Sequence, residues 1–197
     1  MKKNKIKVLC CILTLSIVVG ISTGCTKGGT SKDSKAAVAD TKKKDNSAKL
    51  SKSIKSKDSV AQFNVPESWS EMDSLNPVAN LQVGNLKEEK YLLNISEKKT
   101  SFSDSMTLKD YYNIITQNMS TAVVNANLTD PKEITINGNK ALQFELSGEV
   151  EKIKVSYLIT IIDAEKHFHQ VLTWTLMDKF NEYKGEYSDI VNTFKEM

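Results

Sequence analysis

The sequence predicts an α+β sandwich domain with a mainly antiparallel sheet and two principal helices. Three observations lead to this fold class: strand patterns come first, an amphipathic helical pattern follows, and alternating strands then run into a second helical pattern. Strands and helices that occur in separate runs are typical of α+β domains. We expect a signal peptide at residues 1–24, a lipidated cysteine with a tether at 25–58, and one domain at 59–197.

The N-terminal segment has the parts of an export signal. Residues 1–7 carry four lysines, residues 8–21 carry no charge, and small residues precede Cys25. These are the regions of a signal peptide, and the apolar stretch is shorter than the roughly 20 residues of a spanning helix. Thr23-Gly24-Cys25 resembles a bacterial lipobox, although Ser22 stands where leucine is usual. The resemblance implies a palmitate-type lipoprotein on the extracytoplasmic face of the cell membrane.

The three cysteines fit the same interpretation. Cys10 and Cys11 lie in the apolar stretch that processing removes, and Cys25 becomes an acylated N-terminus. No disulfide is then expected within one chain. A diacylglycerol group supplies the two acyl chains that stable anchoring requires. The alternative for Cys25 is a free thiol after an ordinary signal peptidase site.

Residues 26–58 differ in composition from the domain that follows. They hold ten lysines, four acids and no aromatic residue, and such a segment cannot bury enough apolar surface to offset its ordering entropy. We expect a disordered tether of net charge +6 that either attracts anionic head groups and wall polymers or is merely solvated. Residues 59–197 hold thirteen lysines against twenty acids, a net charge of −7. The chain has no arginine, and nucleic acid is not expected as a partner.

The first half of the domain predicts strands and then a helix. Strands are expected over residues 61–65, where Pro66 stops the pattern, and over 78–86 and 91–97. From Thr107 to Val123 the apolar residues recur at helical spacing. Thr107, followed three residues later by Asp110, is typical of a helix N-terminus.

The second half predicts a meander of strands and a closing helix. Asn137-Gly138 tolerates the positive φ angles of a tight hairpin and links residues 134–136 to 141–146. Residues 150–162 and 167–176 alternate apolar and polar side chains, so each has one buried face. From Phe180 to Phe194 the apolar residues again follow helical spacing.

The domain resembles the PsbP-like superfamily, which includes the extrinsic photosystem II protein, a Ran-binding nuclear import factor and bacterial envelope lipoproteins. The matching stretches are Phe63-Asn64-Val65-Pro66-Glu67-Ser68-Trp69, the run from Ile136 to Glu145, and the last strand leading into residues 180–194. The resemblance implies an αβα sandwich used as a docking module, with protein partners and no shared catalytic set. It therefore transfers no functional residue. Pro66 and Trp69 are expected to set a turn and fill the core.

His167 and His169 are the two histidines of the chain. On a strand, this spacing points both side chains to one face, and paired imidazoles suit transition metals. Asp163 and Glu165 lie just before them and could add oxygen ligands at the rim of a hairpin. The alternative is that both imidazoles face solvent opposite a buried Phe168.

Catalytic patterns are sparse. The sequence contains no G-x-S-x-G elbow and no phosphate-binding loop, and no cofactor is expected. The histidines could still serve a distant serine, because triads are defined by geometry. Glu145, Glu149 and Glu151 could act as acid and base in a hydrolase of wall or glycan, or could belong to a solvated acidic face.

We therefore expect a non-enzymatic envelope lipoprotein whose acidic domain docks a protein partner or presents a shallow ligand site near the membrane. A carboxylate hydrolase is the first alternative. Metal capture by His167 and His169 is the second.

Overall fold

The computed structural model of this chain describes residues 49–197. The expected signal peptide, Cys25 and most of the expected tether lie outside the described residues. In the first half the elements are β1 (Lys52–Lys55), β2 (Ala61–Val65), β3 (Ser70–Glu71), β4 (Leu81–Asn85), β5 (Lys90–Lys98), the 3₁₀ turn η1 (Lys99–Ser101) and α1 (Leu108–Ala122). In the second half they are β6 (Val124–Leu128), β7 (Lys132–Ile136), β8 (Asn139–Val150), β9 (Ile153–Asp163), β10 (His167–Leu176), α2 (Phe180–Val191) and β11 (Lys195–Glu196).

The strands form two antiparallel sheets. The large sheet has the order β3-β4-β5-β10-β9-β8-β6, and β7 also pairs with β8. The small sheet has the order β1-β2-β11, so it joins the first described strand to the last. Strand β10 is hydrogen-bonded to β5 on one side and to β9 on the other. Both backbone edges of β10 are therefore paired within the sheet.

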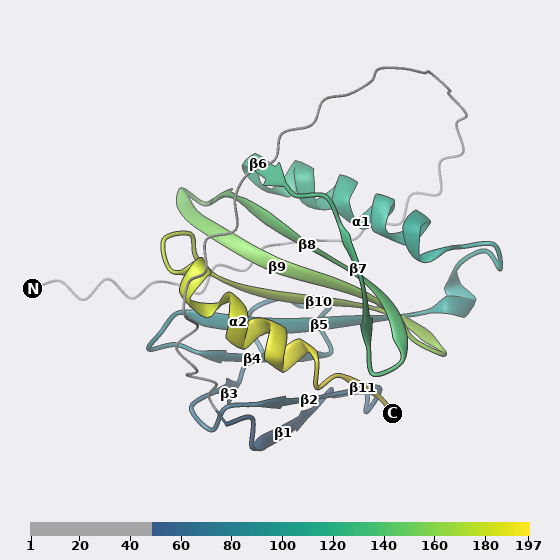
Figure 1. The fold of residues 1–197 in the computed structure, drawn as a ribbon, viewed down its shortest axis with the longest axis horizontal. Coiled ribbons are helices and arrows are strands. Elements are labelled where there is room, and N and C mark those ends of the chain that lie inside the picture. The colour runs from purple at the N-terminus through teal and green to yellow at the C-terminus, as the bar shows by residue number, and fades with distance from the viewer. Residues whose placement is uncertain (1–48) are drawn as a thin grey trace, which may run out of the picture. The chain divides into compact units, whose positions relative to one another are not determined.

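The two helices cover opposite faces of the large sheet (Figure 1). Successive residues of a strand point to opposite faces, and Phe168 of β10 stacks on Tyr111 of α1 with ring centroids 4.5 Å apart. Val171, at an odd position of the same strand, belongs to the hydrophobic cluster that contains Tyr187 of α2. Phe63 of the small sheet lies in that cluster as well. One face is thus covered by α1, and the other by α2 together with the small sheet.

The predicted fold class is confirmed, since the described residues form an α+β sandwich with a mainly antiparallel sheet and two helices. Strands β2 and β10 have the predicted bounds, and β8, β9 and β10 form the predicted meander. Thr107 caps α1 through a reciprocal pair of contacts with Asp110, as its spacing indicated. Trp69 is fully buried, and its backbone N–H donates to the Pro66 carbonyl, which makes the expected turn.

Two boundaries were wrong. The strand expected over residues 150–162 includes Val150, which ends β8, and a two-residue turn that precedes β9. Residues 52–55 were assigned to the tether, but they form strand β1, and Ile54 is buried in the core cluster. The lysine-rich composition hid this strand because three of its four residues are polar and only one side chain points inward. No helix among the described residues is long and apolar enough to cross a membrane.

A buried ion pair fastens α2 to the large sheet. The Lys90 ammonium, which is 5% exposed, donates to Glu186 at 2.7 Å. The Trp69 indole N–H also donates to Glu186, at 3.0 Å. Burial opposes the charge on Lys90, but the hydrogen bonds to Glu186 and Glu88 outweigh it and raise its pKa. Removing one partner of such a buried pair is strongly destabilising.

The turn between β8 and β9 is strained. Glu151 and Lys152 both have positive φ angles, 48° and 70°, and two-residue turns of this type favour Asn-Gly. We predict that changing Glu151→Asn together with Lys152→Gly raises the unfolding free energy by about 1 kcal/mol, measured by urea unfolding.

A matched control is available in the turn between β7 and β8. Gly138 has a φ of 84° and open space around its missing Cβ, so Gly138→Lys tests backbone strain without a clash and should destabilise by a similar amount. An Asn-Gly exchange at 151–152 that left stability unchanged or lower would show that this turn carries no strain.

Candidate functional site

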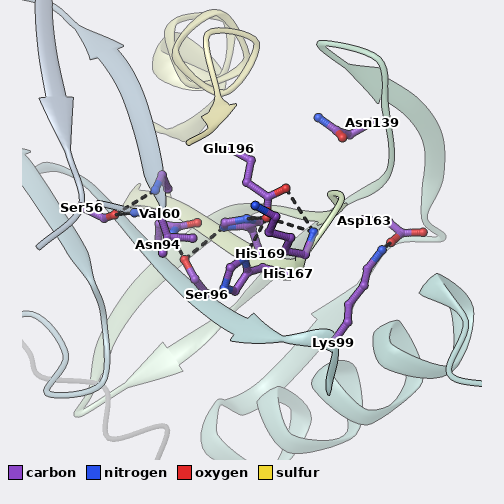
Figure 2. Close-up of polar contacts among 12 residues, drawn as sticks. Ser56, Val60, Asn94, Ser96, Lys99, Asn139, Asp163, His167, His169 and Glu196 are labelled. Atoms are coloured by element: carbon purple, nitrogen blue, oxygen red, sulfur yellow. Dashed lines mark hydrogen bonds and ion pairs between the residues drawn. The ribbon is translucent and has the colours of Figure 1, made fainter. Parts of the chain in front are cut away.

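His167 and His169 lie side by side on β10, on the face that packs against the small sheet (Figure 2). His169 is 0% exposed and His167 is 9% exposed. The two rings lie 5.7 Å apart, as their spacing on one strand predicted. The alternative of solvent-facing imidazoles is wrong, because β10 is an interior strand and β11 covers this face.

The expected oxygen ligands do not join the histidines. Asp163 is opposite Phe168 in the strand register, so its side chain lies on the other face of the sheet. There it pairs with the ammonium of Lys99. Glu165 is exposed in the turn before His167. The sequence placed these acids nearby in the chain, but the pleat of the strand and the turn direct them elsewhere.

Glu196 supplies the carboxylate that sequence reasoning missed. It lies on β11, opposite Ala61 of β2. Its Oε1 accepts a hydrogen bond from His167 Nδ1 at 2.8 Å and lies 3.5 Å from His169 Nε2. The backbone N–H of Lys166 donates to the same carboxylate. No local spacing could reveal this residue, because pairing of β11 with β2 brings it there.

The second nitrogen of His169 has its own partner. Nδ1 lies 3.1 Å from Ser96 Oγ, and Ser96 Oγ accepts a hydrogen bond from Asn94 Nδ2 at 2.9 Å. Ser96 and Asn94 lie on β5, opposite His169 and Val171 of β10. His169 Nε2, in contrast, is buried without a hydrogen-bond partner. Its contact with Glu196 Oε1 is 3.5 Å long.

The environment fixes the charges of the site. Burial lowers the pKa of His169 to about 4, even though Glu196 favours the protonated ring. Burial opposes the ionisation of Glu196, but hydrogen bonds from His167 and from the Lys166 backbone outweigh it and lower the pKa of the carboxyl. Near neutral pH the site therefore presents a neutral His169 imidazole beside an ionised carboxylate.

These donors suit two kinds of chemistry. His167, His169 and Glu196 could hold a divalent metal, since their donor atoms all lie within 4.8 Å of one another. Ser96, His169 and Glu196 are also arranged in space in the order of a serine–histidine–carboxylate triad. The second arrangement does not present a usable base, because the His169 ring is fully buried and a general base must reach the substrate proton.

Of the three glutamates named for hydrolysis, Glu145 and Glu149 both lie on β8 and are too far apart to act as a catalytic pair. Glu145 is ion-paired with Lys184 of α2, Glu149 is opposite Lys154 in the sheet, and Glu151 is exposed in the strained turn. Four residues along a strand separate Glu145 from Glu149 by about 13 Å. Two cooperating carboxylates of a glycosidase lie closer, at roughly 5 to 9.5 Å.

A small cavity lies on the other face of the large sheet, between the end of α1 and the sheet. Its volume is about 30 Å³, and its lining is apolar apart from Asn76; it includes Met119, Leu146, Leu172 and Trp174. Ligand pockets are commonly about 300 to 1,000 Å³. The cavity is therefore too small for an organic substrate and is remote from the histidines.

Comparison with known proteins identifies the fold. The described domain has the PsbP-like fold, as the sequence resemblance implied. The solution structure of cyanobacterial PsbP (CyanoP) from Synechocystis sp. PCC 6803 matches with a TM-score of 0.57 and 15% identity over 74% of this chain and 92% of that chain. A crystal structure from Bacteroides thetaiotaomicron VPI-5482 matches with a TM-score of 0.53 and 11% identity over 75% of this chain and 49% of that chain.

Other comparisons are weaker. LpqN, described as involved in cell envelope biogenesis of Mycobacterium tuberculosis, has a TM-score of 0.49 at 11% identity, over 68% of this chain and 82% of that chain. That score is too low to support a shared function. No protein-family model and no curated protein sequence matches the chain. At identities this low, structural likeness shows the fold alone.

Acid should destabilise the metal-free protein through His169. The unfolded imidazole binds its proton near pH 6.5 and the folded one near pH 4, so the unfolded state binds more protons between these values and stability falls as pH falls. We predict a loss of about 2 to 3 kcal/mol between pH 7 and pH 4, measured by urea unfolding with a chelator present.

His169→Leu is the variant for comparison, because it removes the titrating ring from the same site. Its pH dependence should be much flatter above about pH 4.5. Below that value both proteins still lose the contribution of Glu196, whose folded pKa is lowered. Identical pH profiles for the two proteins would contradict the assignment to His169.

Proposed function

We propose that this chain is a bacterial envelope lipoprotein, anchored through Cys25, whose PsbP-like domain is a non-enzymatic module that docks a protein partner close to the membrane. The PsbP-like fold and the expected lipobox support this proposal. The observation that carries the docking role is the charge on the solvent face of α2.

The lysines of α2 and its N-cap are already paired, while two of the three acids of α2 are exposed. Lys179 contacts Glu89 of the turn before β5, and Lys184 pairs with Glu145 of β8. Glu182 and Asp189 are exposed on the same helix. The Trp69–Glu186 hydrogen bond brings Trp69, which directly precedes β3, next to α2. Further exposed acids lie around β3: Glu67 before it, Glu71 within it and Asp73 after it. The result is an acidic surface made by α2 and the β3 edge.

This charge distribution favours a partner with a basic face. Clustered charge of one sign steers association and raises its rate. The same acids are repelled by anionic lipid head groups, whereas the basic segment 26–51 is attracted to them. The proposed arrangement therefore places the basic segment at the membrane and leaves the acidic surface of the domain available to a protein.

Membrane attachment is tested at Cys25. We predict that the full-length chain sediments with membranes and that Cys25→Ala releases the exported protein into the soluble fraction, since two acyl chains give stable anchoring. Thr26→Ala serves as a control beside the same cleavage point. Equal sedimentation of the two variants would contradict lipidation as the anchor.

Docking is tested by charge reversal on α2. We predict that Glu182→Lys with Asp189→Lys reduces recovery of crosslinked envelope proteins by about tenfold or more, because it replaces attraction by repulsion. Asp104→Lys with Asp130→Lys makes the same change in net charge at exposed acids before and after α1. If both double variants recovered the partner equally, or if the unchanged chain recovered none reproducibly, the acidic surface would not be the docking site.

A further inference from the structure

We propose that His167, His169 and Glu196 form a binding site for a divalent transition metal ion, with Zn²⁺ the ion of best fit. This inference goes beyond the docking role and holds whether or not a protein partner is found. The site lies on the face of the large sheet that α2 and the small sheet cover, at the place where the small sheet meets β10 (Figure 2). Its basis is the geometry of three side chains that come from two different sheets.

The donor atoms are already gathered. His167 Nδ1 and Glu196 Oε1 lie 2.8 Å apart, and His169 Nε2 lies 3.5 Å from the same oxygen. All three donor groups lie within 4.8 Å of one another. Tetrahedral zinc with ligands at about 2.0 to 2.1 Å keeps its donors about 3.3 Å apart. Small side-chain rotations therefore bring this set to the spacing of a zinc site.

A buried nitrogen faces the site without a hydrogen bond of ordinary geometry, because His169 Nε2 has only the 3.5 Å contact with Glu196 Oε1. The side chain of His169 is fully buried and its Nε2 has no hydrogen bond. Protein interiors rarely leave such an atom unpaired. A metal ion at this position would satisfy Nε2 directly, and it would replace the single contact between His167 and Glu196 by two bonds to the ion.

The surrounding groups orient the ligands. A metal-bound imidazole generally uses its other nitrogen in a hydrogen bond that fixes the ring, and His169 Nδ1 lies 3.1 Å from Ser96 Oγ. Glu196 is held by the backbone N–H of Lys166. Ser96 lies on strand β5, and Lys166 lies in the tight hairpin between β9 and β10. The ligands are thus placed by backbone pairing and not by flexible loops.

The donor set selects the class of ion. Two imidazoles and one carboxylate suit zinc and its first-row neighbours, whereas calcium and magnesium prefer oxygen ligands alone. Three protein ligands leave one position of a tetrahedral ion for a water or another donor. Because the site is enclosed by β10 and β11, we assign it a structural role: the ion joins the large sheet to the small sheet at the C-terminus.

The binding test uses the chain from residue 25 to 197 with Cys25→Ser, which removes the one thiol of the mature protein. After treatment with a chelator, Zn²⁺ is added in a calorimetric titration, and Co²⁺ is added separately to follow the absorption spectrum of its coordination. We expect one ion per chain, a rise in the thermal midpoint, and slower hydrogen exchange at the Met197 amide, which bonds the Val60 carbonyl at 2.9 Å.

Three variants decide whether the ion occupies this site. Glu196→Gln and His169→Gln should each weaken Zn²⁺ binding by on the order of 100-fold or more and abolish the rise in thermal midpoint. Glu165→Gln removes an equal charge from an exposed residue outside the cluster and should bind as the parent does. Circular dichroism in chelator checks that each variant folds.

The proposal is overturned by either of two results. One is the absence of saturable Zn²⁺ binding to the parent chain at micromolar concentrations. The other is equal affinity in the parent, Glu196→Gln and Glu165→Gln, since this would place the ion on dispersed surface carboxylates. If His169→Gln fails to fold, Glu196→Gln still decides the question, because that change preserves size and shape.

Discussion

The need to cover both faces of one large sheet governs this structure. Helix α1 covers one face of strand β10, and α2 with the small sheet covers the other, so side chains on both of its faces are buried and not on one face as its alternating pattern indicated. Apolar residues meet that condition without cost, but each polar residue must find a partner inside the protein. Gln170 bonds Glu97 and Tyr111 on the α1 face, and Thr173 bonds the Leu158 carbonyl on the other. His169 makes one such contact through Nδ1, and its Nε2 has only the 3.5 Å contact with Glu196.

The covering of the second face depends on the end of the chain. After α2, Phe194 packs against Phe63 and against the ring of His169, and Glu196 then reaches the histidines. Strand β11 has two residues, and a strand this short gains its stability from what it contacts. The same residues that complete the core therefore complete the polar cluster. This coupling explains why a bound ion is expected to stabilise the fold as a whole.

The sequence predicted those elements whose signals are local. Strand β10 alternates over ten residues, and α1 has both a capping pair and an apolar stripe, so their identity does not depend on distant contacts. Strands β3 and β11 have two residues each and exist only through pairing with β4 and β2. Strand β6 begins two residues after α1 ends, so its start reads as a continuation of the helix.

The candidate site also has one part that local sequence predicts and one part that long-range pairing determines. The shared face of His167 and His169 follows from the period of a strand, and it was predicted. The sequence did not predict which carboxylate lies beside the histidines. Asp163 and Glu165 are close to them in sequence, whereas Glu196 is close to them in space. The pleat turns Asp163 to the opposite face, and a register between two strands brings Glu196 in. Long-range pairing of this kind has no signature in a single sequence.

Three side chains from two sheets are proposed to share one ion. Anomalous diffraction at the zinc absorption edge, from crystals of the zinc-treated chain, would locate that ion. We expect a single strong peak at about 2.0 to 2.2 Å from His167 Nδ1, His169 Nε2 and a Glu196 carboxylate oxygen. A structure with zinc present in the crystals, but with no peak between β10 and β11, would contradict it.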